Sequence, residues 1–478
     1  MKIKYLIILS ILIKSLFAEI GYSHKGYFDL GTIHRLSDGS IIKVPYRMMT
    51  YESITSYQNL NLIMSAALEF RLRNIKKLLN SEISTDIREL YLEFLVPIGD
   101  IRIGKQIVTW GSTSENNPTD NVSPYNYYYL FSIGKERKEG IFSINSNIYI
   151  NDININTLLI PFHKSNILPL NDPEFAITTP LVPKDEQIKN LDKPFEYGIS
   201  INIPMGIMDI STSYFSGYDK IVSFFGANVW ANKAFTTITA DTVLSFRKTD
   251  IFGLGFSALF NDLTIKTDIG YFITDDNINN NNSLYRNYPK GEQLIIESCE
   301  ETNANLPNWA EQIDCNNEPT LKEILKLDNA AKYLQYVIEF EYSPNSEFRL
   351  ISQYSKQKSI QFGQADSLTL STETVSLDPE QLFIPGMGSP NTFISDNSLS
   401  VSIQKQFSNI GLKINFTNLF DLNRKGSIHE LRTEYEIYEN IKLLAAINKI
   451  YSNKTIEMNP FSGMEDFSHF RIELKYFY

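Results

Sequence analysis

The sequence contains few of the residues from which catalytic and metal sites are usually built. Its 478 residues include two cysteines, five histidines and three tryptophans. It has no nucleophile elbow, no glycine-rich phosphate loop and no HExxH motif. We therefore expect no enzymatic activity, no cofactor and no metal site. A hydrolase site hidden among scattered polar residues is the alternative that stays open.

The chain also lacks an excess of positive charge and, beyond its N-terminus, any long apolar run. Its formal net charge is -11, which argues against a nucleic-acid partner. A membrane-spanning helix needs about 20 consecutive apolar residues. The protein is therefore expected either to be exported and soluble or to cross a membrane with strands.

Residues 1–18 have the pattern of a secretory signal peptide. Lys2 and Lys4 precede an apolar run over residues 5–13, and the small residue Ala18 follows at the expected cleavage position. The alternative is a buried strand or helix at the N-terminus. The pattern predicts export, with residues 19–478 as the mature chain.

The two cysteines, Cys299 and Cys315, lie close together in a polar segment. An isolated pair in an exported chain predicts a disulfide that closes a loop. Two free thiols are the first alternative. A metal site is the second, but no histidine lies near enough in sequence to complete one.

Apolar and charged residues alternate strictly at the C-terminus. Over residues 470–478, five apolar residues on one face oppose Arg471, Glu473 and Lys475 on the other. This alternation, ending in an aromatic residue, is typical of the last strand of an outer-membrane barrel and of the signal read by the barrel-assembly machinery. The same alternation recurs over residues 66–72, 89–94, 197–203, 334–342 and 431–437.

Short and long connections alternate between these strands. Short turns are predicted at residues 97–100, 151–152, 204–206, 261–262, 343–345, 408–409 and 439–440, and long connections near 111–138, 163–193, 277–330, 363–396 and 454–467. This pattern predicts an all-β, transmembrane antiparallel β-barrel with short periplasmic turns and long extracellular loops. Counting back from the C-terminus gives 18 strands, the first two near residues 26–34 and 42–51, with 16 as the second choice. A soluble β-sandwich is the alternative fold.

Two segments do not have a strand pattern. From Pro319, apolar residues recur at helical intervals and predict a short helix inside the longest loop. The proline-rich residues 161–185 are excluded from a central strand, because proline cannot donate to the ladder. We expect this segment to pack on the barrel mouth or to fold into it.

The charged faces must point into the lumen, because an Arg or Lys facing lipid costs about 2 to 4 kcal/mol at the midplane. These charges either pair across neighbouring strands or line a constriction that filters solutes by charge. Residues 103–131 read "IGKQIVTWGSTSENNPTDNVSPYNYYYLF", and the part over residues 111–131 is a candidate constriction loop, whose tyrosines are expected near the outer aromatic girdle. The proline-rich connection over residues 163–193 is a second candidate. The pore-lining and constriction candidates are Arg71, Glu93, Arg102, Gln106, Trp110, Asn117, Asp120, Glu339, Arg432, Glu434, Arg471 and Glu473.

Residues 87–126 resemble a group of Gram-negative outer-membrane proteins of uncharacterised function, which are porin-like and related in architecture to alginate-export porins. Residues 194–204, "PFEYGISINIP", resemble a strand of the same group. Lys105 departs from the pattern, because it is in phase with isoleucines that are expected to face lipid. Its ammonium group is therefore expected to reach the periplasmic interface, or the residue marks a bulge. The residues that match the motif of the group are Arg102, Gly104, Gln106, Trp110, Gly111, Asn117, Pro118, Asp120 and Pro124.

The resemblance implies an outer-membrane channel or substrate-specific porin and names no solute. We therefore expect passive diffusion of small hydrophilic or amphipathic solutes through a wet lumen, with outer-membrane lipid around the barrel. The alternative function is a surface protein whose barrel is an anchor and whose long loops bind another cell, as in an adhesin.

Overall fold

The computed structural model describes residues 20–71, 82–114, 116–129, 132, 134–170, 172–174, 183–191, 193–275, 290–307, 309–364, 366–370, 373–456 and 459–478. The predicted signal peptide, residues 1–18, lies outside the described residues.

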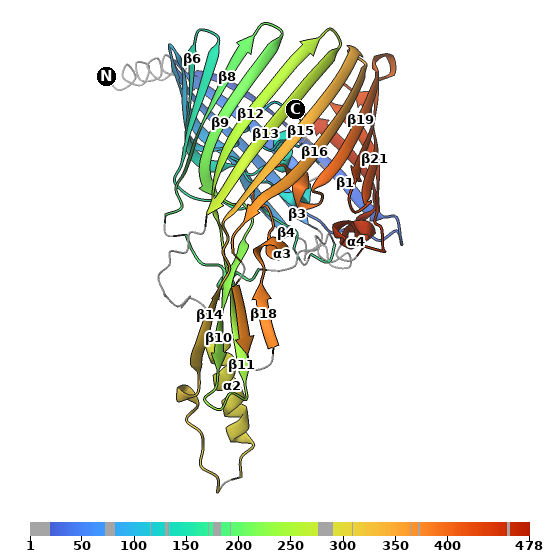
Figure 1. The fold of residues 1–478 in the computed structure, drawn as a ribbon. Coiled ribbons are helices and arrows are strands. Elements are labelled where there is room, and N and C mark those ends of the chain that lie inside the picture. Colours follow the sequence, from blue (N-terminus) through green and yellow to red (C-terminus); the bar gives the residue numbers. More distant parts are fainter. Residues whose placement is uncertain are drawn as a thin grey trace, which may run out of the picture.

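Eighteen antiparallel strands close into a barrel (Figure 1). Closure is made by β1, which pairs with β2 on one side and with the last strand, β23, on the other. The prediction of 18 strands is therefore confirmed, and the count of 16 is wrong. The barrel strands are β1 (Ile20–Arg35), β2 (Tyr46–Tyr57), β3 (Leu60–Arg71), β4 (Glu82–Val96), β5 (Gly99–Gln106), β6 (Ile141–Ile150), β7 (Ile153–Ile160), β8 (Glu196–Met205), β9 (Met208–Tyr218), β12 (Lys248–Phe260), β13 (Leu263–Asp275), β15 (Ala331–Asn345), β16 (Phe348–Phe362), β19 (Asn397–Phe407), β20 (Leu412–Asp421), β21 (Ser427–Tyr438), β22 (Ile441–Tyr451) and β23 (His469–Phe477).

The outer face of the barrel is apolar and carries aromatic residues at both ends. Exposed aromatics near the short turns include Tyr57, Phe94, Tyr149, Phe260, Tyr342, Tyr438 and Tyr476. Exposed aromatics near the long connections include Phe142, Phe162, Phe195, Tyr197, Phe252, Phe420 and Tyr451. Two aromatic girdles that flank an aliphatic band are the surface of a transmembrane barrel, because aromatic side chains favour the lipid–water interface.

The predicted short turns lie at one end of the barrel, and the C-terminus lies at that same end (Figure 1). There the backbones of Tyr478 and Gly26 exchange two hydrogen bonds of 3.1 Å. The long connections lie at the opposite end. We call these two ends the short-turn end and the long-loop end.

The second strand begins later than the sequence predicted. It spans Tyr46–Tyr57 instead of residues 42–51, and the chain before it runs inside the barrel mouth, where Ile42 and Val44 are buried. Pro45 separates the two parts. Because proline has no N–H for the strand ladder, the ladder starts only after it.

Three long connections together build an extension beyond the long-loop end (Figure 1). It contains a three-stranded sheet of β10 (Ser223–Ala231), β11 (Ile238–Ser245) and β14 (Thr320–Lys326), and a hairpin of β17 (Asp366–Leu370) and β18 (Glu373–Leu377). Helix α2 (Lys290–Ala304) packs against β10 and β11. A disulfide joins Cys299 on this helix to Cys315.

The helix predicted from Pro319 is wrong, because this segment forms β14 and pairs with the edge of β10. The register of that pair shifts between Glu323 and Leu321, which leaves Lys322 as a bulge. A bulge inserts one residue and breaks the period-two pattern of a strand. The apolar residues of β14 therefore fall at intervals that imitate a helix.

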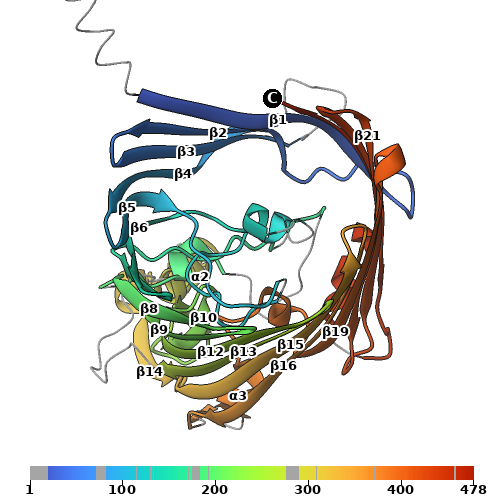
Figure 2. The ribbon, with the colours of Figure 1, turned by 90° about the horizontal axis from the view of Figure 1, so that it is seen from above.

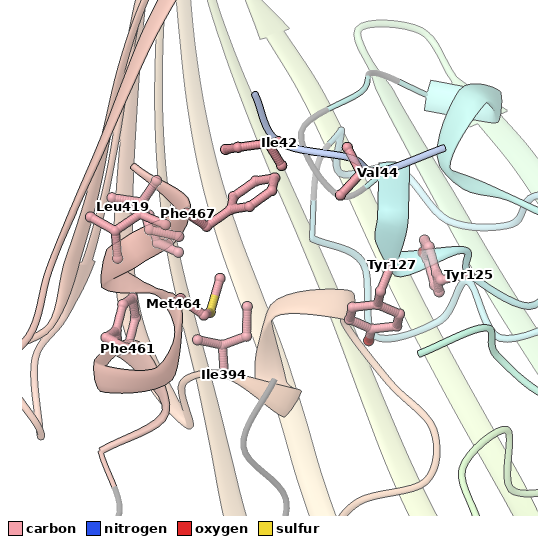
Figure 3. Close-up of a cluster of buried hydrophobic side chains, with 11 residues drawn as sticks. Ile42, Val44, Tyr125, Tyr127, Ile394, Leu419, Phe461, Met464 and Phe467 are labelled. Atoms are coloured by element: carbon pink, nitrogen blue, oxygen red, sulfur yellow. The ribbon is translucent and has the colours of Figure 1, made fainter. Parts of the chain in front are cut away.

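A hydrophobic cluster fills part of the lumen near the long-loop end (Figure 3). It joins the short helix α4 (Pro460–Met464), and the region of the 3-10 helix Pro390–Phe393, to the barrel wall. The expectation that the tyrosines of residues 125–129 lie in the outer girdle is wrong, because two of them belong to this cluster. Its members are Ile42, Val44, Tyr125, Tyr127, Ile394, Leu419, Ile428, Ile450, Phe461, Met464 and Phe467.

None of the helices that the described ranges contain is long and apolar enough to cross a membrane.

We predict that the disulfide stabilises the extension and not the barrel. Replacing both Cys299 and Cys315 by serine removes a cross-link that closes a short loop, which is worth about 3 kcal/mol. Limited proteolysis should then cut the extension faster than in the wild type, while the β-sheet signal in circular dichroism stays unchanged. Equal cutting rates in the two proteins would contradict this role.

Candidate functional site

After β5 the chain leaves the wall and runs through the lumen. Figure 2 shows this segment inside the ring of strands. We call the described part of residues 107–140 the inward segment. Gly111 makes its first bend with a φ of +91°, and a Cβ there would collide with the side chains of Asn117 and Thr119. A glycine is therefore required at this bend.

Trp110 anchors the start of the inward segment against the wall. Its indole N–H donates to Asn156 Oδ1 on β7 at 2.9 Å, and its ring meets Phe215 of β9 edge-on with centroids 6.2 Å apart. A Cβ at Gly198 on β8 would lie 2.6 Å from the indole ring. Trp110 therefore lies in the lumen, on the side of β7 to β9.

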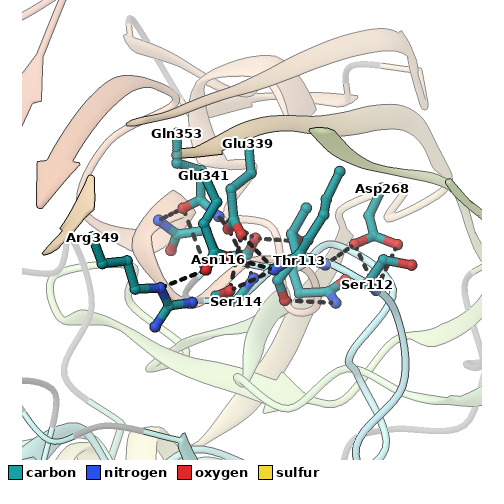
Figure 4. Close-up of polar contacts among 11 residues, drawn as sticks. Ser112, Thr113, Ser114, Asn116, Asp268, Glu339, Glu341, Arg349 and Gln353 are labelled. Atoms are coloured by element: carbon teal, nitrogen blue, oxygen red, sulfur yellow. Dashed lines mark hydrogen bonds and ion pairs between the residues drawn. The ribbon is translucent and has the colours of Figure 1, made fainter. Parts of the chain in front are cut away.

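Two carboxylates on the wall accept backbone N–H groups of the inward segment (Figure 4). Asp268 on β13 accepts from Ser112 N at 2.9 Å and from Thr113 N at 2.6 Å. Glu339 on β15 accepts from the backbone N and the Oγ of Ser114, both at 2.9 Å. Both carboxylates are fully buried. Charged acceptors make these bonds stronger than bonds between neutral groups.

The neighbouring residue, Asn116, continues this anchoring to β16. Its side-chain amide donates to Gln353 Oε1 at 3.0 Å, and its Oδ1 accepts from Asn391 N at 3.3 Å. Glu339 is itself held by Lys266, whose Nζ lies 3.0 Å from Glu339 Oε1. The contacts of Ser112, Thr113, Ser114 and Asn116 thus form one network over three adjacent strands.

The far end of the inward segment is held by arginines on the opposite wall. Glu136 lies 2.7 Å from both Arg47 on β2 and Arg88 on β4. Arg47 also stacks 3.8 Å above the ring centroid of Tyr129. Burial raises the pKa of Glu136, but the two guanidinium groups outweigh it and hold the pKa below its ordinary value.

Contacts within the inward segment fix its shape. Asn117 donates to Trp110 O at 3.0 Å and accepts from Thr119 N at 2.9 Å. Asp120 accepts from Trp110 N at 3.1 Å and pairs with Lys138 at 2.8 Å. Burial lowers the pKa of Lys138, although Asp120 opposes that shift. Asp120 and Asn117 therefore hold the segment folded.

Lumen-facing glycines mark the area that the inward segment covers. A Cβ at Gly253 would lie 2.9 Å from Thr119, one at Gly255 3.1 Å from Ser112 Oγ, and one at Gly270 3.0 Å from Pro118 O. These glycines lie on β12 and β13. Side chains at these positions would push the segment off the wall.

The proline-rich connection also reaches the barrel mouth. Its Asp172 pairs with Arg71 at the end of β3 at 2.6 Å and accepts from Tyr128 Oη at 2.5 Å. Burial raises the pKa of Asp172, but these hydrogen bonds and one from Glu174 N keep it below its ordinary value. Arg71 is therefore a mouth residue that ties two connections together.

Two cavities, lined mostly by polar residues, remain between the inward segment and the rest of the wall. The β20 cavity, of about 220 Å³, is bordered by Asn116 and Arg137 on the segment and by β16 and β19 to β22 on the wall. The β23 cavity, also of about 220 Å³, is bordered by Tyr128, Tyr129, Ser132 and Glu136 and by β1, β2 and β23. Both are lined by Ser132 and Arg432.

The predicted pore-lining residues divide between these cavities and other parts of the lumen. Arg432 lines both cavities, and it pairs with Glu434 at 2.8 Å. Arg471 and Glu473 line the β23 cavity and pair at 3.2 Å.

Arg102 and Glu93 lie elsewhere in the lumen. They pair at 2.9 Å near the short-turn end, and Arg102 also lies 3.0 Å from Asp100. Gln106 is buried and accepts from Asn145 at 3.3 Å. Neither Arg102 nor Gln106 lines either cavity.

Lys105 lies near the long-loop end of β5, so it does not reach the periplasmic interface. It pairs with Asp86 on β4 at 3.3 Å. Between Asp86 and Leu90, the β4 residue that pairs with Lys105, the register of β4 with β3 shifts and leaves Arg88 as a bulge.

Sequence reasoning did not identify the residues that contact the inward segment from the wall or fix its shape. They are Asp268, Gln353, Lys138, Asn156, Arg47 and Arg88. Alternation alone places a polar side chain on the lumen face but does not say what it contacts. The glycines at positions 198, 253, 255 and 270 were the available signal, because several side-chain-free positions on one lumen surface imply that another segment covers it.

Among the described residues, no group of three or more His, Cys, Asp or Glu could hold a metal ion.

The fold and the inward segment define the class of the protein: a transmembrane β-barrel with an internally folded connection and cavities beside it.

No family model matches the chain, and no curated protein matches it. The resemblance to the uncharacterised porin-like group therefore stays a prediction. Solved structures similar to this chain include OccAB1 of Acinetobacter baumannii (9% identity, TM-score 0.45, 96% of each chain covered).

Two further structures are OccK8 (OprE) of Pseudomonas aeruginosa (10% identity, TM-score 0.46, covering 96% of this chain and 97% of that chain) and a loop-deletion mutant of OmpT, an outer membrane protein of Vibrio cholerae (10% identity, TM-score 0.39, covering 96% and 100%). At these scores the likenesses assign neither a solute nor an activity to this chain.

We predict that the wall carboxylates keep the inward segment in place. Asp268→Asn combined with Glu339→Gln removes both negative charges and leaves one neutral acceptor oxygen on each side chain, which weakens each anchor by roughly 1 to 3 kcal/mol. The double variant should show a larger and noisier single-channel current in planar bilayers.

The control is Asp209→Asn, an exposed residue of β9 near the short-turn end. Its current should equal that of the wild type. A quiet, unchanged current in the double variant would show that these carboxylates do not hold the segment.

Proposed function

We propose that the protein is an outer-membrane channel through which small hydrophilic solutes diffuse passively. The path runs through the β20 and β23 cavities, between the inward segment on one side and strands β16 to β23, β1 and β2 on the other. The observation that carries this proposal is the position of the two cavities. They adjoin at Ser132 and Arg432, and charged and neutral polar side chains line both.

The chemistry of the path suits hydrated solutes. On the wall of the β20 cavity, Ser402 Oγ lies 3.0 Å from Asn415 Oδ1 and 3.1 Å from Thr417 Oγ1. In the β23 cavity, Lys475 lies 3.1 Å from Asp29. Neutral groups and paired charges can exchange hydrogen bonds with a passing solute without trapping an ion, which conduction requires.

The location in the outer membrane follows from the barrel itself. The apolar band and the two aromatic girdles fit a bilayer, and in Gram-negative cells closed β-barrels of this type reside in the outer membrane. Apolar and charged residues alternate along β23, and the chain ends with Phe477 and Tyr478. This pattern supports recognition by the barrel-assembly machinery.

The alternative function, a barrel that serves only as an anchor for a binding surface, is supported by the extension but not by the lumen. An anchor has no use for adjoining polar cavities through its centre. A steady current through the purified protein in a planar bilayer favours the channel function, and the absence of any current contradicts it.

We predict that Arg432 sets the charge preference of the path. Arg432→Ala removes a positive charge that borders both cavities, and one unit charge about 4 Å from an ion is worth about 1 kcal/mol in water, or roughly fivefold in a permeability ratio. The ratio of cation to anion permeability, measured as a reversal potential in a salt gradient, should rise by up to that factor.

Arg102→Ala is the matched control, because Arg102 faces the lumen outside both cavities and is paired with Glu93 and Asp100. Its permeability ratio should stay close to that of the wild type. If Arg102→Ala changes the ratio as much as Arg432→Ala does, the path does not follow the two cavities.

A further inference from the structure

A third cavity, of about 320 Å³, lies at the long-loop end, where the extension joins the barrel. We call it the mouth pocket. One side is formed by Ile167 and Leu168 of the proline-rich connection. The other side is formed by the chain that leads into β10 and out of β11, including Val222, Phe224 and Phe246.

The mouth pocket differs from the two lumen cavities in the types of residue that line it. Aliphatic and aromatic side chains make up most of its lining, whereas amide, hydroxyl and charged groups are prominent around the lumen cavities. Small-molecule sites are typically concave, mostly apolar and about 300 to 1,000 Å³ in volume. An apolar cavity stays dry and takes up apolar molecules, because water gains too few hydrogen bonds inside it.

One end of the mouth pocket is polar. Asn166, Lys220 and Ile221 border both this pocket and a small polar cavity of about 20 Å³, which is also lined by Asn121 and Ser123 of the inward segment. A cavity of that size holds about one water molecule. A molecule in the mouth pocket can therefore direct a polar group toward this end.

The charge at the polar end is already neutralised. Lys220 Nζ lies 2.8 Å from Glu196 Oε2, and both side chains are buried. Burying a further unpaired charge beside this pair would cost several kcal/mol. The polar end therefore favours an uncharged hydrogen-bonding group over a carboxylate or an ammonium group.

Backbone contacts separate the mouth pocket from the channel path. Lys220 N donates to Gly386 O at 2.8 Å, and residues 385–389 lie between the small polar cavity and Gln335 on β15. The pocket is therefore a site in its own right at the outer mouth, apart from the β20 and β23 cavities.

We propose that the mouth pocket binds a small amphipathic molecule, with an aliphatic or aromatic body and one uncharged hydrogen-bonding group. The body lies among Val222, Phe224 and Phe246, and the polar group points toward Asn166. This binding does not depend on the proposed channel function.

Binding is tested on the full-length protein in lipid nanodiscs, with phenethyl alcohol as the probe and phenylacetate as its charged counterpart. Equilibrium dialysis against empty nanodiscs corrects for partition into lipid. Phenethyl alcohol should bind saturably. The affinity for phenylacetate should be lower by a factor of about ten or more, because its carboxylate must lose its water shell in the pocket.

Two variants and one control locate the site. Val222→Asp puts a charge into the pocket and Val222→Trp fills it, so both should abolish saturable binding. Ile238→Asp makes the same chemical change on β11, at an exposed position away from the pocket, and should bind like the wild type. Circular dichroism checks that each variant is folded.

Three outcomes overturn the proposal: no saturable binding to the wild type, equal binding of the two probes, or unchanged binding in Val222→Trp. A wild type that binds the probe but passes no current would refute the channel and leave the pocket standing. A wild type that conducts but does not bind the probe would refute the pocket and leave the channel standing.

Discussion

A chain segment inside a barrel must find partners for its backbone N–H groups, because an unpaired buried N–H is costly. Asp268 and Glu339 meet this requirement for residues 112–114. At the other end of the inward segment, the carboxylate of Glu136 pairs with Arg47 and Arg88 of the wall. The shape of the lumen depends on these few charged contacts.

The positions of the anchors decide where the lumen stays open. One anchor is on β13 to β16 and the other on β2 and β4, so the inward segment crosses the lumen as a chord and covers β5 to β12 (Figure 2). The arc from β19 through β23 to β1 carries none of these anchors on its polar face. Both path cavities lie along that arc.

Much of the fold could be predicted from the sequence, because a strand between lipid and water has a period of two that is visible in the residues themselves. The same period could not show that β10, β11 and β14 leave the wall, since a strand in a small sheet alternates as well. The bulge at Lys322 even imitated a helix. Trp110 and Asp120 were among the constriction candidates, but Asp268 and Asn156 were not, because contacts between distant strands leave no local pattern.

The central claim is that the inward segment covers one side of the lumen and leaves the other open. Its most direct test is the reactivity of single introduced cysteines, since the two native cysteines are joined in a disulfide. Thr417→Cys, in the β20 cavity, should react with a water-soluble thiosulfonate and lower the conductance. Asn156→Cys, under Trp110, should stay unreactive. Rapid reaction at Asn156→Cys with none at Thr417→Cys would contradict the account.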